Sequence, residues 1–200
     1  FCIIFPTIQF ERSVIMSSDN HNANNYETRL DLWIKARPNF SGLLMCIQEK
    51  NNRIYLGKEP FENERVRIAP NKYISEVQFT KTESMPEAQT WFSNNLCFNT
   101  GLIAIIGNKG SGKSALADII ALLGGCKNTH EFSFLNQNRF LNPHCNYASN
   151  IHATLKWKSD DKTSKLLSEG VKDSEVERVR YLPQEHIENI CNELSNGSNS

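Results

Sequence analysis

Residues 102–123 hold the pattern that most constrains the fold of this chain. Leu102–Ile106 is a continuous apolar run, LIAII, which is typical of a strand buried on both faces. A glycine-rich stretch follows it. The period then becomes helical, with an apolar face at i, i+3, i+4 and i+7 made by Leu116, Ile119, Ile120 and Leu123. Gly124 and Gly125 are expected to end the helix. The pattern predicts a buried strand, a tight loop and a helix running from Lys113 to Leu123, and therefore an α/β fold.

The glycine-rich stretch GNKGSGKS, residues 107–114, fits the phosphate-binding pattern G-x-x-x-x-G-K-[ST], also called Walker A. Its glycines let backbone N–H groups turn inward around a phosphate chain, and the following helix directs its N-terminal dipole at the same anion. Lys113 is expected to reach the β- and γ-phosphates, and the Ser114 hydroxyl to bind Mg²⁺. The sequence thus predicts ATP and Mg²⁺ as cofactors, held by Gly107, Asn108, Lys109, Gly110, Ser111, Gly112, Lys113, Ser114 and Ala115.

The details of this loop indicate a class of nucleotide-binding protein. Glycine at its fourth place, Gly110, is typical of ATPases of the ABC, SMC and RecF types, although Lys109 stands where those proteins usually carry asparagine. A guanine-binding protein would need an NKxD-like element later in the chain, and the sequence has none. We therefore expect an incomplete P-loop NTPase head of ABC/SMC/RecF type with a small antiparallel β lobe.

A second element, VRYLPQ at residues 179–184, resembles a Q-loop, because a short apolar strand candidate ends in Pro183 and Gln184. In that role Gln184 would approach Mg²⁺ and the attacking water as a catalytic residue. The alternative is a plain strand end. After Ser114 no apolar run ends in Asp-Glu, so a Walker B carboxylate is missing, and LSNG at residues 194–197 lies too close to Gln184 to be an ABC signature. We expect little ATP turnover by this chain alone.

Composition excludes several other functions. The chain of 200 residues carries 22 Lys plus Arg and 22 Asp plus Glu, so a basic nucleic-acid tail or a polybasic membrane patch is not its main feature. No apolar run approaches the roughly 18 residues of a membrane span, and no signal peptide is indicated. The six cysteines form no CxxC pair, which suits free thiols in a reducing cytosol. A cytoplasmic protein without a membrane partner is expected.

The rest of the chain predicts a division near Pro70. Residues 58–72 are charged and carry two prolines, and are interpreted as a linker. Before it we expect strands at 32–34 and 53–56 and a helix at 43–49. After it we expect a long solvated loop at 158–176 and a strand at 179–182. Two further strands, at 73–82 and 151–158, should share a small antiparallel sheet, because Ile151, Ala153, Leu155 and Trp157 alternate with polar residues.

Residues 91–123 together with 181–194 resemble the TrlF-type bacterial ATPases, in which a PHP phosphoesterase domain is fused to an ABC/SMC-like ATPase. Residues 33–43 and 53–57 are similar to the segment that closes the PHP domain in that family. The resemblance implies that residues 1–70 are the end of a PHP-like region and that residues 71–200 begin the ATPase domain. It also implies ATP-dependent work on nucleic acid, in anti-phage defence or DNA repair, by a head-to-head homodimer. The PHP metal ligands are not in this chain.

Two other functions fit the same loop. One is a nucleotide-binding regulatory or scaffold module that never hydrolyses ATP. The other is a small-molecule kinase, which would need a lid and an acceptor site that the sequence does not indicate. ATP turnover that is lost in Lys113→Ala would favour the ATPase, and tight binding without turnover would favour the regulatory module.

Overall fold

The structure is a computed structural model that describes residues 21–22, 24, 30–82, 95–144 and 147–183. The chain divides into two compact units, Phe1–Ile68 and Ala69–Ser200, which are described separately below. Both combine helices with a small antiparallel sheet, so the chain is mixed α/β. That the first unit derives from a PHP region stays a prediction.

The first unit is built on a two-stranded sheet, in which β1 (Leu32–Ile34) pairs antiparallel with β2 (Ile54–Leu56). Between these strands lie α1 (Phe40–Gln48) and the short α2 (Lys50–Arg53). Both strands were expected. Helix α1 begins three residues before the predicted start, because the Asn39 side chain caps it by accepting a hydrogen bond of 2.8 Å from the Gly42 amide.

The predicted linker at 58–72 is wrong in part, since it contains α3 (Phe61–Ile68) and a 3-10 turn at Pro70–Lys72. The sequence FENERVRI has no apolar face, and none of its residues is buried. Arg67 instead forms ion pairs with Glu59 at 3.1 Å and with Glu64, three residues before it, at 4.0 Å. Such pairs support a solvated helix that an apolar-periodicity argument misses.

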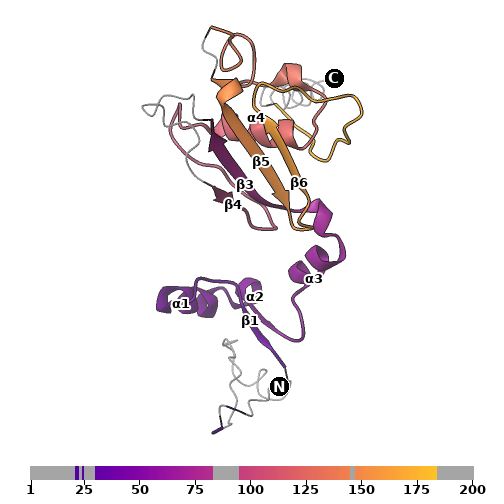
Figure 1. The fold of residues 1–200 in the computed structure, drawn as a ribbon. Coiled ribbons are helices and arrows are strands. Elements are labelled where there is room, and N and C mark those ends of the chain that lie inside the picture. The colour runs from indigo at the N-terminus through magenta and orange to yellow at the C-terminus, as the bar shows by residue number, and fades with distance from the viewer. Residues whose placement is uncertain (1–20, 23, 25–29, 83–94, 145–146, 184–200) are drawn as a thin grey trace, which may run out of the picture. The chain divides into compact units, whose positions relative to one another are not determined.

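The second unit is organised around a four-stranded antiparallel sheet in the order β4-β3-β5-β6 (Figure 1). Its strands are β3 (Ile74–Lys81), β4 (Leu96–Cys97), β5 (Ile151–Trp157) and β6 (Lys162–Leu166). The pairing of β3 with β5, which sets Val77 opposite Leu155, confirms the predicted antiparallel sheet. The predicted alternation on β5 is also confirmed, because every second side chain from Ile151 to Trp157 is buried.

Helix α4 (Lys113–Leu123) covers this sheet and packs against β5 and β6. Its bounds are those predicted, and Gly124 forms its C-cap, with Gly125 following at φ +75°. The apolar side chains of the helix and the sheet make one core. Its fully buried members include Val77, Ile119, Leu123, Ile151, Ala153, Leu155 and Leu167. Helix α4, whose N-terminus carries the glycine-rich loop, is therefore held rigidly on the sheet.

The predicted solvated loop at 158–176 is wrong over its first half, where β6 forms the edge of the sheet. Its sequence, KTSKL, is polar, but Lys165 is only 6% exposed and Leu167 is fully buried. The Lys165 ammonium donates to Glu175 Oε2 at 2.5 Å and to the Gly170 carbonyl at 3.2 Å. This polar sequence forms a strand because it pairs with β5 and because Glu175 neutralises Lys165. Local strand propensity does not reveal either contact.

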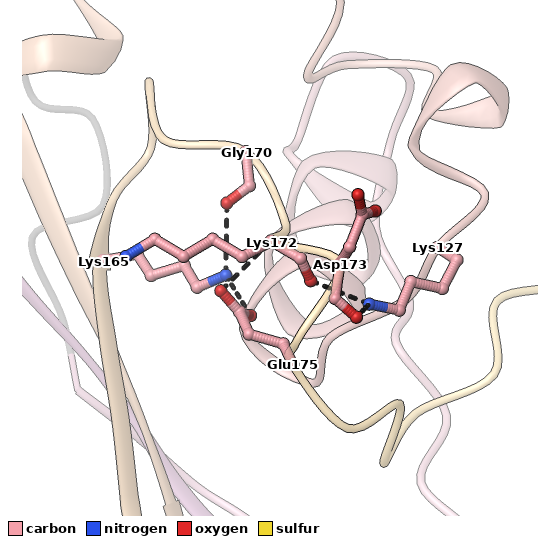
Figure 2. A network of polar contacts seen from close by, with 6 residues as sticks. All are labelled: Lys127, Lys165, Gly170, Lys172, Asp173 and Glu175. Atoms are coloured by element: carbon pink, nitrogen blue, oxygen red, sulfur yellow. Dashed lines mark hydrogen bonds and ion pairs between the residues drawn. The ribbon is translucent and has the colours of Figure 1, made fainter.

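Figure 2 shows how polar contacts hold residues 170–175 beside β6. Lys127 donates to the carbonyls of Lys172 and Asp173, at 2.8 and 3.2 Å, while Glu175 accepts from Lys165 and from the Lys172 amide. The hydrogen bond from Lys165 holds the pKa of the Glu175 carboxyl below its ordinary value of 4.5, against the opposing effect of burial. A lowered pKa in the folded state means that this carboxylate stabilises the fold above pH 4.5 and loses that contribution as the pH falls below it.

We expect Glu175→Gln to lower the free energy of unfolding by about 1.5 kcal/mol at pH 7, because it leaves the buried Lys165 ammonium without its anion. The variant should also unfold with a weaker dependence on pH below 4.5 than the parent chain. Urea unfolding at pH 7, 5, 4 and 3 measures both effects, with Glu169→Gln, an exposed carboxylate in the same segment, as the control. Equal pH dependence in the parent and in Glu175→Gln would contradict the assignment.

Candidate nucleotide-binding site

The glycine-rich loop lies at the N-terminus of α4 and is exposed over residues 107–111. Gly110 and Gly112 both adopt left-handed backbone conformations, with φ of +85° and +87°, that side-chain-bearing residues rarely adopt. A Cβ at Gly107 would lie 2.5 Å from the Ser111 hydroxyl oxygen, a contact that rotation of the Ser111 side chain would relieve. The loop backbone therefore depends on Gly110 and Gly112, and left-handed residues of this kind turn successive N–H groups to one side.

The Lys113 side chain folds back across this loop. Its ammonium donates to the carbonyl oxygens of Gly107 and Asn108, both at 2.8 Å. Ser114 is exposed in the first turn of α4, while Ala115 behind it is buried. The first turn of α4 carries no acidic residue. The Lys113 ammonium and the N-terminus of α4 thus meet at one place, which favours binding of a polyanion.

The apolar segment before the loop departs from prediction. Leu102–Ile106 forms no strand, and Leu102 is fully exposed while Ile106 is 90% exposed. A strand buried on both faces needs hydrogen-bonded neighbours and two covering layers. The segment pairs with none of the strands in the described part of the chain. The interpretation of this run as a buried strand is therefore wrong for the structure of this chain.

Sequence reasoning missed Asp118, which lies on α4 one turn after Ser114 and is fully buried. Its Oδ2 accepts hydrogen bonds from the backbone amides of Phe134 and Leu135, at 2.6 and 3.1 Å. Its Oδ1 is also buried and has no hydrogen-bond partner among the described residues. The sequence signal for Asp118 was a lone carboxylate among the apolar residues of the predicted helix. Charged side chains are seldom fully buried unless they have a partner.

The segment 178–183 forms no strand, although one was predicted for 179–182. Its backbone is fastened at the end of the helix, where the amides of Arg178 and Val179 donate to the Gly124 carbonyl at 2.7 and 3.1 Å. Further along, the Tyr181 ring meets the Phe132 ring edge to face, with centroids 5.3 Å apart. Burial, and then a hydrogen bond to the Asp118 carboxylate and its charge, raise the pKa of the Tyr181 hydroxyl above its ordinary value. Gln184 lies outside the described residues.

A cavity of about 320 Å³ adjoins this segment. Two segments, 128–131 and 177–183, supply its polar and charged groups. Its lining consists of Asn128, Glu131, Glu177, Arg180, Tyr181, Leu182 and Pro183. Within the described part of the chain, no cluster of three or more His, Cys, Asp or Glu side chains could hold a metal ion.

Comparison with known proteins identifies no relative, since no family model, curated protein or solved structure matches the chain. Among the described residues, no helix has the length and apolar character that crossing a membrane requires.

Proposed function

We propose that the loop of residues 107–115 binds ATP with Mg²⁺. The observation that carries the proposal is the combination of two left-handed glycines, Gly110 and Gly112, with a lysine whose ammonium already lies across the loop. On binding, the Lys113 ammonium would exchange two carbonyl partners for phosphate oxygens, and the exposed Ser114 hydroxyl would bind the metal ion. Mg²⁺ would neutralise phosphate charge, and the loop amides would orient the chain of phosphates.

Titration calorimetry tests this proposal directly. The chain is titrated with ATP in the presence of Mg²⁺, with GTP, and with inorganic phosphate. We expect both nucleotides to bind more tightly than inorganic phosphate, because a chain of phosphates contacts more of the loop than a single phosphate does. ATP should bind more tightly than GTP, because the sequence has no NKxD-like element for guanine. The absence of any binding of ATP would overturn the proposed function.

We further propose that the chain is part of an ABC/SMC/RecF-type ATPase that works on nucleic acid in the cytoplasm as a head-to-head homodimer. Gly110 in the loop and the resemblance of residues 91–123 to TrlF-type ATPases support this class. The rival is a nucleotide-binding regulatory module without hydrolysis. ATP turnover in the natural protein, lost in Lys113→Ala, favours the ATPase over that rival.

The resemblance of residues 179–184 to a Q-loop supports a role for Gln184 in the same site.

We expect Gln184→Ala to leave the affinity for Mg-ATP within about twofold and to lower the rate of hydrolysis by about tenfold or more in the natural protein. A neutral amide adds little to ground-state binding, but it orients the attacking water in the transition state. Calorimetry and steady-state turnover on this variant measure the two constants. An unchanged rate would remove Gln184 from the site and leave a plain chain segment in its place.

A further inference from the structure

The glycine-rich loop carries a second cation, Lys109, that no contact of the folded chain explains. Its side chain is exposed and has neither a hydrogen bond nor an ion pair among the described residues. Lys113, by contrast, is held by two backbone carbonyls. Since ATPases of the ABC, SMC and RecF types usually carry asparagine at the place of Lys109, this chain departs from them by one positive charge on the loop.

A β-turn fixes the place from which the Lys109 side chain starts. The Ser111 amide donates to the Asn108 carbonyl at 3.2 Å and so closes the turn, in which Lys109 is the second residue. Gly110, the third residue, has a φ of +85°, as a type II turn requires. The same Asn108 carbonyl accepts a hydrogen bond of 2.8 Å from the Lys113 ammonium. Lys109 therefore starts from the peptide group on which Lys113 lies.

This place sets Lys109 at the end of the loop where the terminal phosphate of a nucleotide would lie. In a loop of this motif the backbone amides hold the α- and β-phosphates, and the motif lysine reaches the β- and γ-phosphates. The Lys113 ammonium marks that end of the loop, and it lies on the carbonyl that directly precedes Lys109. The long, flexible stem of a lysine that starts there is sufficient to bring its ammonium to the γ-phosphate.

The charges of the loop segment all have the same sign. Between residues 95 and 117 the two lysines are the only charged side chains. Asp118, the next one along the chain, is fully buried, and its Oδ2 accepts from the amides of Phe134 and Leu135. Neither lysine forms an ion pair within the described part of the chain. Two ammonium groups beside a helix N-terminus repel each other, and a bound polyanion removes that repulsion.

We propose that Lys109 makes the loop prefer a nucleoside triphosphate to a diphosphate, by placing a second cation at the γ-phosphate. The inference rests on the proposed function and names the substrate class of the same site. Lys113 and the loop amides also serve the β-phosphate, which ATP and ADP share. Lys109 contacts only the phosphate that ADP lacks, so its charge contributes to the difference between the two affinities.

Titration calorimetry of the whole chain in the presence of Mg²⁺ compares ATP with ADP in the parent and in Lys109→Gln, which removes the charge but keeps a long polar side chain. We expect the substitution to weaken ATP binding by about three- to tenfold, because an exposed cation is partly screened by salt, and to change ADP binding by no more than about twofold. Lys109→Arg keeps the charge and should restore the preference for ATP. Lys113→Ala is the contrasting variant, because it should weaken the binding of both nucleotides.

Inorganic triphosphate and diphosphate repeat the comparison without a nucleoside. Lys109→Gln should weaken the binding of triphosphate by the same factor and leave diphosphate within about twofold. If the parent binds Mg-ATP but Lys109→Gln weakens ATP and ADP equally, or weakens neither, the role of Lys109 is wrong and the proposed function stands. An effect on ATP that triphosphate does not share would also overturn the role of Lys109. If the parent chain binds no Mg-ATP, the proposed function fails and this inference fails with it.

Discussion

Lys113→Ala is expected to weaken the binding of Mg-ATP by about 10- to 150-fold. The ammonium of Lys113 lies across the loop, 2.8 Å from each of two backbone carbonyls. Charge-assisted hydrogen bonds contribute about 1.5–3 kcal/mol, and that range gives the stated loss in affinity. Titration calorimetry of both proteins under identical salt conditions measures it.

The control for this experiment is Lys158→Ala, which removes an exposed lysine with the same charge from the turn after β5. Its affinity for Mg-ATP should stay within about twofold of the parent, because the removed charge is exposed to solvent and screened by salt and does not belong to the glycine-rich loop. Equal affinities of Lys113→Ala and the parent chain would show that the loop does not hold the phosphates, and the proposed site would be withdrawn.

Leu155→Ala is expected to lower the free energy of unfolding of the second unit by about 2–5 kcal/mol. Leu155 is fully buried at the centre of β5, opposite Val77 on β3 and Thr163 on β6, where it faces the layer formed by α4. Its removal leaves a cavity between the sheet and the helix, which the surrounding strands cannot close without breaking their pairing. Urea unfolding followed by far-ultraviolet circular dichroism gives the change.

Lys162→Ala is the matched control, because it truncates an exposed side chain on the neighbouring strand of the same sheet. Substitutions of this kind usually change stability by no more than about 0.5 kcal/mol. A loss below about 1 kcal/mol in Leu155→Ala would mean that the sheet and α4 do not share one core. A loss in the expected range would also explain how the glycine-rich loop is kept in position, since α4 carries that loop.

Periodicity in the sequence was sufficient for the elements whose own residues alternate or repeat. Helix α4 and strand β5 were predicted close to their observed bounds because their apolar side chains recur with the periods of a helix and of a half-buried strand. The same holds for the glycine-rich loop, since Gly112, which the motif fixes as glycine, and Gly110 both adopt left-handed conformations. In these segments the local physical preference and the tertiary environment agree.

Only the tertiary structure decided the features that depend on a partner far away in the sequence. The polar segment β6 becomes a strand because it pairs with the edge of β5 and because Glu175 neutralises Lys165. The apolar run Leu102–Ile106 stays exposed because no strand among the described residues pairs with it. The buried position of Asp118 depends on hydrogen bonds from the amides of Phe134 and Leu135, which lie 16 and 17 residues further along the chain. The sequence by itself determined which segments could form a helix, a strand or a phosphate loop, because those tendencies are local. Pairing and burial are properties of two segments at once, so the choice among the remaining possibilities belonged to the folded chain.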